Sequence, residues 1–256
     1  MKRIILPLVL IISALTGCGS FGGVDKIVIG IDDEFAPICF HNERNELVGF
    51  DIDLAREAAE RMGVEIEFKP ITWSDKEEEI LSGNIDMIWN GLDITEERKE
   101  YMIFTRPYMN DRQILLVRQG DDQEIHSEED LEGKIVGTQA GSTSDCYIRQ
   151  NEKLKNTLKE YKTYMKFNEV VAALKSGEID VLICDELVAR YEINKSPGQF
   201  ELLNVRIGSI AEMAVGFGKD KVKLRDEVQK AFNGMIKDGT AQKISEKWFQ
   251  ADLIRE

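Results

Sequence analysis

Residues 89–98, WNGLDITEER, combine a helix start with a basic side chain that does not suit it. Thr95 is a good N-cap, and Glu96 and Glu97 suit a first helical turn, where the macrodipole favours acidic groups. Arg98 falls at the third helical position, where a cation does not stabilise the helix. An arginine there can reach back over the helix start and bind a carboxylate through two parallel hydrogen bonds. The alternative is a surface arginine paired with a nearby glutamate.

A second candidate for binding a carboxylate is the glycine-rich stretch 137–145, GTQAGSTSD, which ends in a helix start. Free backbone N–H groups at such a start bind anions. Simple capping would explain one hydroxyl, whereas Ser142, Thr143 and Ser144 supply three. The strand VLICDE brings Asp185 to its end, where a carboxylate can bind an ammonium group. An arginine and N–H groups for a carboxylate, with an aspartate for an ammonium, form a site for a zwitterionic amino acid.

Alternating α and β segments must position these groups. The alternation of apolar residues and the β-branched content predict strands, and apolar residues in one stripe predict helices. Glycine is expected to end the first helix at Gly63. We expect strands over 26–33, 64–71, 85–89 and 112–118, helices over 49–63 and 73–84, a turn, strand and helix start over 131–145, and a helix and strand over 168–186.

Two segments share one pattern. ILSGNIDMIWN and ALKSGEIDVLICD each contain Ser-Gly-x-Ile-Asp followed by apolar residues, which indicates a helix, a glycine and a strand. Any αβ unit would have a helix and a glycine, but the repeated context predicts two α/β lobes built on similar lines. In open α/β sheets ligands bind beyond the carboxyl ends of strands. Residues 89–98 and 184–186 are therefore candidate binding edges, one from each lobe.

The N-terminus has the pattern of a secretory signal. Lys2 and Arg3 precede an apolar stretch over 4–15, which is shorter than the roughly 20 residues of a membrane span. Leu15-Thr16-Gly17-Cys18 resembles the bacterial lipobox, in which signal peptidase cuts before the cysteine and the thiol is lipidated; the alternative is an ordinary signal with a chance cysteine. We expect a signal peptide over 1–17, lipidation of Cys18 and a tether over 18–24.

The charge and the cysteines exclude some functions. The formal net charge is −14 and becomes −16 without Lys2 and Arg3, which argues against nucleic acid as a partner. Apart from Cys18, the chain has Cys39, Cys146 and Cys184, with no CxxC motif and only two histidines. A structural zinc site is not expected, and neither is any other metal site or cofactor. One disulfide with one cysteine left over, or three reduced cysteines, are both compatible with the sequence.

The chain resembles the polar amino-acid solute-binding family of bacterial ABC importers, in its lipoprotein form. The matching motifs are IGIDDEFAPICF, LVGFDIDLAREAAERMG, GNIDMIWNGLDITEERKEYMIFTRPY, LEGKIVGTQAGST, LKSGEIDVLICDE and LRDEVQKAFNGMIKDGTAQKISEKWF. They cover nearly all of 25–256 in family order. The resemblance implies an α/β, two-lobe periplasmic-binding-protein type II fold. Lobe 1 would span 25–111 and 211–256, lobe 2 would span 112–210, and two strands would cross near 110–113 and 209–213.

The resemblance also implies roles for individual residues. It makes Arg98 the carboxylate clamp and places backbone N–H groups near Gly91 and Thr143 on the same carboxylate. Asp185 would hold the α-amino group, with the Asn90 carbonyl beside it. The side-chain end of the pocket would be lined by Asp32, Phe35 and Trp73.

One position departs from the family pattern. The family usually has threonine or serine where this chain has Asp93, so Asp93 and Asp185 would face one ammonium group. Either the pocket favours additional positive charge, or Asp93 turns away to cap the helix. Trp89, just before this loop, is expected in the core rather than in the pocket.

The resemblance implies a receptor that binds a polar or basic amino acid, or cystine, and delivers it to an ABC permease. It would be a monomer, held by its lipid at the extracytoplasmic face of the cell membrane, and not an enzyme. The alternative is a cyclohexadienyl dehydratase-like enzyme on the same fold. A dehydratase needs a general acid, and His41 is the one histidine near a binding motif. A signalling module is disfavoured because we recognise no kinase, transmembrane or peptidoglycan-cleaving segment in 25–256.

Overall fold

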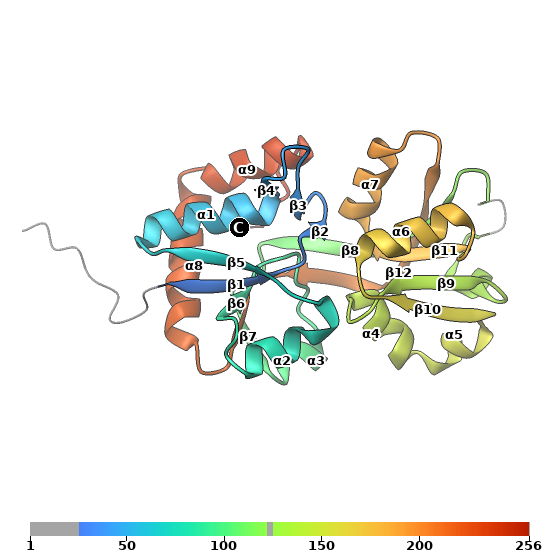
Figure 1. Cartoon of the computed structure of the whole chain (residues 1–256), viewed down its shortest axis with the longest axis horizontal. Coiled ribbons are helices and arrows are strands. Elements are labelled where there is room, and N and C mark those ends of the chain that lie inside the picture. Colours follow the sequence, from blue (N-terminus) through green and yellow to red (C-terminus); the bar gives the residue numbers. More distant parts are fainter. Residues whose placement is uncertain (1–25, 122–124, 256) are drawn as a thin grey trace, which may run out of the picture.

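Two five-stranded sheets form the centres of two lobes that lie side by side (Figure 1). The computed structural model describes residues 26–121 and 125–255. The predicted signal peptide, the tether and the lipidation site at Cys18 lie outside these residues. Within the described residues, no helix has both the length and the apolar character needed to cross a membrane.

Lobe 1 contains a mixed sheet of order β5-β1-β6-β13-β7. The strands are β1 (Ile27–Ile31), β5 (Ile66–Pro70), β6 (Met87–Ile88), β7 (Met102–Phe104) and β13 (Gly216–Gly218). The helices are α1 (Phe50–Met62), η1 (Trp73–Asp75), α2 (Lys76–Leu81), α3 (Glu96–Lys99), α8 (Val222–Lys237) and α9 (Thr240–Phe249). A small sheet follows β1 and consists of β2 (Glu34–Phe35), β3 (Cys39–His41) and β4 (Leu47–Val48). Helices α1, α8 and α9 pack against one another.

Lobe 2 contains a sheet of order β10-β9-β11-β8-β12. The strands are β8 (Met109–Arg118), β9 (Ile135–Gln139), β10 (Glu160–Tyr164), β11 (Val181–Asp185) and β12 (Phe200–Met213). The helices are η2 (Glu128–Leu131), α4 (Thr143–Gln150), α5 (Glu152–Thr157), α6 (Phe167–Ser176) and α7 (Glu186–Lys195). Alternate residues of β8 enter opposite core clusters, since Ile114 and Leu116 pack with α6 and Leu115 and Val117 with α4 and α5.

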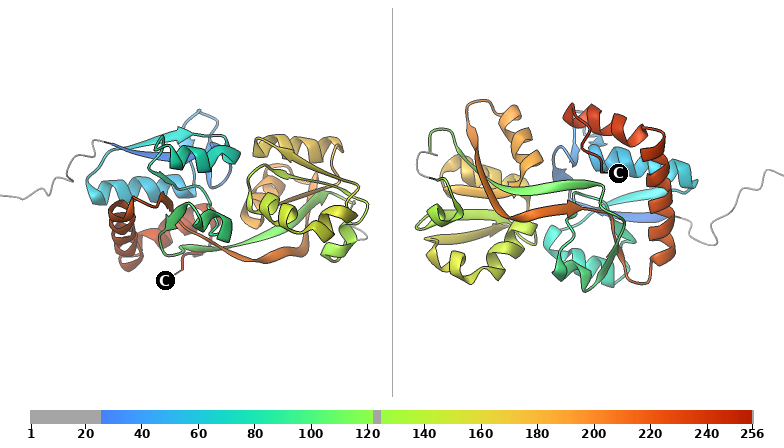
Figure 2. Two further views of the ribbon diagram at one scale, coloured as in Figure 1. Left: turned by 90° about the horizontal axis from the view of Figure 1, so that it is seen from below. Right: turned by 180° about the vertical axis from the view of Figure 1, so that it is seen from behind.

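Two long strands connect the lobes. β8 and β12 pair antiparallel from Met109 opposite Met213 to Arg118 opposite Phe200, and both run from one lobe to the other (Figure 2). Their register shifts between Ile207 and Ala211, close to the predicted crossing segment. The strand expected over 112–118 therefore begins three residues earlier. The first residues of β8 include the polar Asn110 and Asp111, and these interrupt the apolar pattern from which the strand was predicted.

The repeated sequence pattern has the same structural role in each lobe. In lobe 1 the Asp86 carboxylate accepts a hydrogen bond of 2.9 Å from the Val28 N–H at the start of β1. In lobe 2 the Asp180 carboxylate accepts one of 2.8 Å from the Ile135 N–H at the start of β9. Each aspartate also donates its own N–H to the carbonyl of the same partner residue, at 2.8 Å. The repeat therefore reflects a shared way of joining a strand to its neighbour.

Most of the expected elements form, with shifted ends. Helix α1 has acidic residues in its first turn and ends at Gly63, which adopts a left-handed conformation with φ of 66°, as expected for a C-terminal stop. The helix expected over 73–84 is divided into a 3-10 turn and α2. The β2–β3–β4 sheet was not predicted, because strands of two or three residues leave little periodicity in a sequence.

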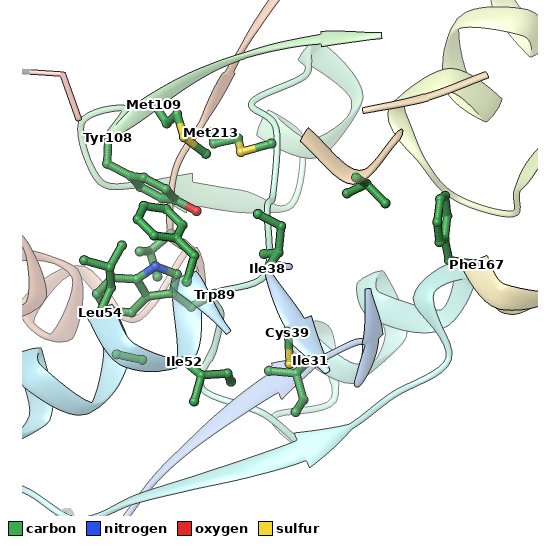
Figure 3. Packing of buried hydrophobic residues seen from close by; sticks show 14 of the residues in the cluster. Ile31, Ile38, Cys39, Ile52, Leu54, Trp89, Tyr108, Met109, Phe167 and Met213 are labelled. Atoms are coloured by element: carbon green, nitrogen blue, oxygen red, sulfur yellow. The ribbon is translucent and has the colours of Figure 1, made fainter. Parts of the chain in front are cut away.

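Trp89 belongs to the core, as expected. Its side chain is 1 % exposed and lies close to Tyr108 and Leu54 (Figure 3). Its indole ring also packs edge-on against Phe232 of α8, with ring centroids 6.3 Å apart. The core of lobe 1 therefore reaches directly beneath the loop that carries Arg98.

The described cysteines form no disulfide. Cys39 and Cys184 are buried and Cys146 is half-buried, and all three are free. Burial raises the pKa of the Cys39 thiol well above its usual value. Of the two alternatives, the structure therefore agrees with three reduced cysteines.

Candidate functional site

A cleft between the lobes gathers most of the predicted site residues. Its volume is about 420 Å³ including its opening to solvent. The residues that line it come from the carboxyl ends of strands and from helix starts in both lobes: Asp32, Phe35, Trp73, Asn90, Gly91, Arg98, Gln113, Thr138, Gln139, Ser142, Thr143, Phe167, Ile183, Cys184 and Asp185. Nine of the ten predicted ligand-binding residues line this cleft, and Asp93 lies behind it, against Thr143.

Arg98 is buried at the junction of the lobes. Thr95 caps α3 by accepting a hydrogen bond of 3.1 Å from the Arg98 N–H, as predicted. The guanidinium is 4 % exposed and donates to the Asp93 carbonyl at 2.7 Å, the Thr143 hydroxyl at 3.4 Å and the Gly141 carbonyl at 3.3 Å. The alternative of a surface arginine paired with a glutamate is therefore wrong.

The bonds of Arg98 leave one side of its guanidinium free. Nη1 makes two of them and Nη2 makes one. A guanidinium has five N–H donors. Within the described chain, the Nε–H and one Nη2–H therefore remain without a partner. An arginine that has an Nε–H and an Nη2–H available can bind a carboxylate through both oxygens.

The three hydroxyls at the start of α4 have different partners. Only Ser142 caps the helix, by accepting a hydrogen bond of 3.1 Å from the Asp145 N–H. The Thr143 hydroxyl instead donates to Asp93 Oδ2 at 2.7 Å, and the Ser144 hydroxyl donates to Gln113 Oε1. Capping thus accounts for one of the three hydroxyls, and the other two connect α4 to carboxylate and amide groups around the cleft.

Gly141 lets the two lobes approach closely. It has φ of 73°, and a Cβ atom there would lie 2.9 Å from Ser74 Cα and 3.0 Å from Lys76 Nζ of lobe 1. Lys76 is 5 % exposed and donates to the Gly141 carbonyl at 2.7 Å and to the Trp73 carbonyl at 3.1 Å. Burial, followed by the nearby Arg98 charge, lowers the pKa of Lys76 to about 7. Lobe 1 therefore contacts the turn before α4 through a buried lysine.

Asp93 does not cap α3. That role belongs to Thr95, and the Asp93 carboxylate is turned toward lobe 2, where Oδ2 accepts the Thr143 bond. The capping alternative is therefore wrong. Asp93 is 1 % exposed, and burial raises the pKa of its carboxyl, although the Arg98 charge and the Thr143 bond oppose the change.

Asp185 lies at the end of β11 beside two further polar groups of β8. Gln113 Nε2 donates to Asp185 Oδ1 at 2.5 Å and to Asp111 Oδ2 at 2.7 Å. Burial raises the pKa of both carboxyl groups, and the nearby carboxylates raise it further. A buried carboxylate with this environment favours a cationic partner.

The backbone N–H of Gly91 is already occupied. It donates to Asp51 Oδ2 at 2.6 Å, and the Tyr108 hydroxyl donates to the same carboxylate at 2.9 and 3.0 Å. Asp51 is fully buried, and burial raises its pKa to about 7. Gly91 lines the cleft, but its N–H cannot at the same time bind a ligand carboxylate as the resemblance implied. The Thr143 N–H has no such partner within the described chain.

The other end of the cleft combines one carboxylate with aromatic rings. Asp32 is 7 % exposed, its Oδ2 accepts a hydrogen bond of 2.6 Å from Gln139 Nε2, and burial raises its pKa. Phe35 of lobe 1 meets Phe167 of lobe 2 edge-on, with ring centroids 5.3 Å apart. A cleft lined by an acidic group and aromatic rings is suited to a cationic or planar polar side chain.

Sequence reasoning missed several residues of the cleft. Gln139 lies inside the quoted GTQAG motif, and Phe167 precedes the repeated helix, so both had a usable signal. Gln113 had none, because the inner face of the strand expected over 112–118 was not assigned. Asp111, which bonds to Gln113 beside the cleft, lay before the expected start of that strand. Among the described residues, Asp93, Asp111 and Asp185 are the group that could hold a metal ion, with one carboxylate oxygen from each within 4.8 Å of the others.

His41 does not reach the cleft. Its Nδ1 lies 3.6 Å from Asp33 Oδ2, its side chain is 37 % exposed, and it lines a groove outside the cleft. A dehydratase would need a general acid beside the leaving group. The structure therefore does not place this histidine where that reaction requires it.

Known proteins share this sequence and fold. The bacterial extracellular solute-binding proteins, family 3, match residues 27–251. A histidine-binding periplasmic protein of Escherichia coli (strain K12) is 30 % identical over 261 residues, covering 99 % of both chains. The L-cystine-binding protein TcyJ of the same strain is 30 % identical over 229 residues, covering 90 % of this chain and 84 % of its own. The crystal structure of an ancestral arginine-binding protein bound to arginine has a TM-score of 0.82 and 35 % identity, covering 88 % of this chain and 99 % of its own.

Two α/β lobes joined by two strands around a polar cleft define a type II periplasmic binding protein. The chain belongs to the bacterial extracellular solute-binding proteins, family 3. Its relatives are substrate-binding proteins rather than enzymes. The expectation of a bacterial polar amino-acid solute-binding protein is confirmed, as is the fold class.

Proposed function

We propose that this protein is the receptor of an ABC importer and binds a basic or other polar amino acid, or cystine, in the cleft. The observation that carries the proposal is the pair of unpartnered donors on the buried Arg98 guanidinium, which lies next to the start of α4 and in the same cleft as Asp185. This arrangement separates a site for a carboxylate from a site for an ammonium group.

The ligand carboxylate binds Arg98 and the N–H groups at the start of α4, including that of Thr143. The α-ammonium group binds Asp185, with the Asn90 carbonyl beside it and Asp93 close behind. Ser142 holds the helix start in place. The side chain of the ligand then points toward Asp32, and three remaining residues cover it: Phe35, Trp73 and Phe167.

Asp32 favours a ligand with a basic or hydrogen-bonding side chain. A buried carboxylate is costly without a cation or hydrogen-bond donors. Arginine, lysine, histidine and cystine are the leading candidates. Relatives named for histidine, cystine and arginine support this choice.

Ligand binding closes the lobes about a hinge. We place the hinge at 110–113 and 209–213, with lobe 1 over 25–111 and 211–256 and lobe 2 over 112–210. The register shift near Gly208, which has φ of 67°, supports a bend in β12 at this point. The closed protein delivers its ligand to the permease as a monomer, and a lipid on Cys18 holds it at the extracytoplasmic face of the membrane.

A thermal-shift screen of the purified protein against the amino acids and cystine tests the proposal, followed by calorimetry of the hits. A ligand at 100 times its dissociation constant should raise the free energy of unfolding by about 2.7 kcal/mol. Stabilisation by arginine, lysine, histidine or cystine supports the proposal. Tight binding of leucine or glutamate alone would contradict the ligand class, and turnover of prephenate or arogenate would favour the dehydratase.

A further inference from the structure

We propose that Lys76 is a positioning residue whose contact with Gly141 ties the closing of the cleft to the release of a proton, so that the amino acid binds more tightly as the pH rises. Lys76 begins α2 of lobe 1, close after Trp73 of the cleft. Gly141 lies in lobe 2, in the turn before α4. The inference rests on the proposed function, because it concerns what happens when a ligand closes the lobes.

The Gly141 carbonyl connects Lys76 to the site for the ligand carboxylate. Lys76 Nζ donates to this oxygen at 2.7 Å, and Arg98 Nη2 donates to the same oxygen at 3.3 Å. The Gly141 N–H donates to Asp145 Oδ2 at 2.8 Å, which holds the turn against the start of α4. Thr143, whose N–H we assign to the ligand carboxylate, follows in the same helix start. Lys76 therefore acts through the turn that carries the carboxylate site.

The environment of Lys76 depends on whether the lobes are closed. Lys76 is 5 % exposed, and a Cβ atom at Gly141 would lie 3.0 Å from its Nζ, so the turn packs directly on this amine. Because Gly141 belongs to the other lobe, opening the cleft breaks the bond of 2.7 Å and brings water to Nζ. Closing the cleft therefore transfers the amine from water into the interior.

The closed contact suits an uncharged amine. Among the described residues, Nζ donates to two carbonyls, those of Gly141 and Trp73, rather than to a carboxylate. An ammonium group has three N–H donors, whereas a neutral amine has two, and each of these two finds an acceptor here. The third N–H of an ammonium would have no acceptor within the described chain, which is unfavourable in the interior.

The charged groups that face Lys76 are balanced in sign. Two cations and two anions surround it, one of each from α3 and from α4: Arg98, Glu97, Arg149 and Asp145. The Trp73 ring favours the charged form, since its centroid lies 5.2 Å from Nζ. Burial dominates, and together with the Arg98 charge it lowers the pKa of Lys76 from the usual 10.5 to about 7.

The direction of the pH effect follows from the two environments. In the open protein water reaches Lys76, and its pKa returns toward the usual 10.5. Between about pH 7 and 10.5 the closed protein then binds fewer protons than the open protein, so raising the pH favours closing. The affinity for the amino acid should rise by about tenfold between pH 7 and 8.5 through this group.

Calorimetry in buffers of different ionisation enthalpy counts the protons released on binding. Wild type, Lys76→Met and the control Lys230→Met are titrated at pH 8 with whichever of arginine, lysine, histidine and cystine binds the wild type most tightly. Lys230 is an exposed lysine of α8 near Glu227. Wild type and control should release about one proton more per bound ligand than Lys76→Met does. A residue with a merely structural role would not change this number.

A pH series on the same proteins supplies the second measurement. The ratio of the wild-type affinity to that of Lys76→Met should rise about tenfold from pH 7 to 8.5, because the titration of the ligand itself is common to both proteins. If Lys76→Met does not fold, as judged by circular dichroism, Lys76→Gln takes its place with the same expected loss of proton release.

Two outcomes would overturn the inference in different ways. Equal proton release and parallel pH profiles in wild type and Lys76→Met would refute the role of Lys76 and leave the proposed receptor intact. Absence of amino-acid binding by the wild type would refute the proposed function, and the inference with it.

Discussion

Gln139 Nε2 of lobe 2 donates a hydrogen bond of 2.6 Å to Asp32 Oδ2 of lobe 1, so an amide and a carboxylate join the lobes at one end of the cleft. The other oxygen, Asp32 Oδ1, accepts a hydrogen bond of 3.0 Å from the Glu34 N–H. Asp32 is thus held by neutral donors from both lobes and no cation pairs with it among the described residues. Its position predicts that Asp32 sets the preference for ligand charge.

Asp32→Asn should weaken the binding of arginine and lysine by about tenfold or more, because hydrogen bonds to charged groups contribute roughly 1.5–3 kcal/mol. Glutamine, which has no side-chain charge, should be affected much less. Calorimetry with both ligand types measures the ratio. Asp33→Asn is the matched control, since Asp33 faces His41 outside the cleft. Equal losses for arginine and glutamine would contradict the role of Asp32.

Arg98→Ala should weaken every accepted amino acid by a similar factor, because all share the carboxylate. Removing one partner of a desolvated charge pair costs about 2–5 kcal/mol, or roughly 30- to several-thousand-fold in affinity. Arg98→Lys should not restore binding, since an ammonium cannot bind both carboxylate oxygens in the same plane. Arg190→Ala, which removes an exposed arginine paired with Glu186, is the control. A folded Arg98→Ala protein within threefold of the wild type would refute the carboxylate clamp.

Asp93→Thr should reduce the affinity for all amino acids by a similar factor and leave their ranking unchanged, because the α-ammonium group is common to them. It should also stabilise the ligand-free protein, since it removes a buried carboxylate oxygen that has no partner. Calorimetry with arginine and glutamine, and thermal unfolding, measure the two effects. If arginine binding falls while glutamine binding does not, Asp93 recognises the ligand side chain instead.

Cys18→Ala should release the protein from the membrane, because the sequence before Cys18 predicts that its thiol carries the lipid. Fractionation of cells that express the variant checks this. Cys146→Ala, which removes a free thiol of α4, should remain in the membrane fraction. A variant without Cys18 that still requires detergent for extraction would contradict the lipid anchor.

Asp51 should make stability depend on pH. Burial raises its folded-state pKa from the usual 3.8 to about 7. Between these values the folded protein binds the proton more tightly than the unfolded chain does, so the stability that this group contributes is fully present below about pH 4 and lost as pH rises through 7. Chemical unfolding of wild type and Asp51→Asn at several pH values should therefore show the wild type losing up to about 4 kcal/mol relative to the variant. Curves that stay parallel from pH 4 to 8 would refute this.

Local patterns predicted the framework well. The cap at Thr95, the stop at Gly63 and the repeated Ser-Gly-x-Ile-Asp unit depend on neighbours in sequence, and all three are in the structure. The family resemblance predicted eight of the residues that line the cleft, and the helix start predicted the ninth, Ser142. The cap, the stop and the repeated unit could be predicted because short-range spacing determines them, whereas the resemblance supplied most of the cleft residues.

Contacts between distant segments could not be predicted in this way. Asp51 takes the Gly91 N–H, and the Thr143 hydroxyl turns to Asp93, in each case across 40 or more residues of sequence. The position of Asp111 could not be predicted, because β8 begins at Met109, before the expected start at residue 112. This longer strand places Asp111 within reach of the Gln113 amide. Tertiary packing decides such partners, within lobe 1 for Asp51 and Gly91 and between the lobes for Thr143 and Asp93.

The placement of β13 has a consequence for the order in which the protein can fold. Residues Gly216–Gly218 lie between β6 and β7, so the sheet of lobe 1 lacks an inner strand until the chain is made almost to its end. Lobe 2, by contrast, is continuous in sequence from β8 to β12. During synthesis or export lobe 2 can therefore fold first. The N-terminal part of lobe 1 remains incomplete until then, with the edges of β6 and β7 unpaired. A truncation before residue 216 should consequently damage the N-terminal lobe, although that lobe is far from the cut in sequence.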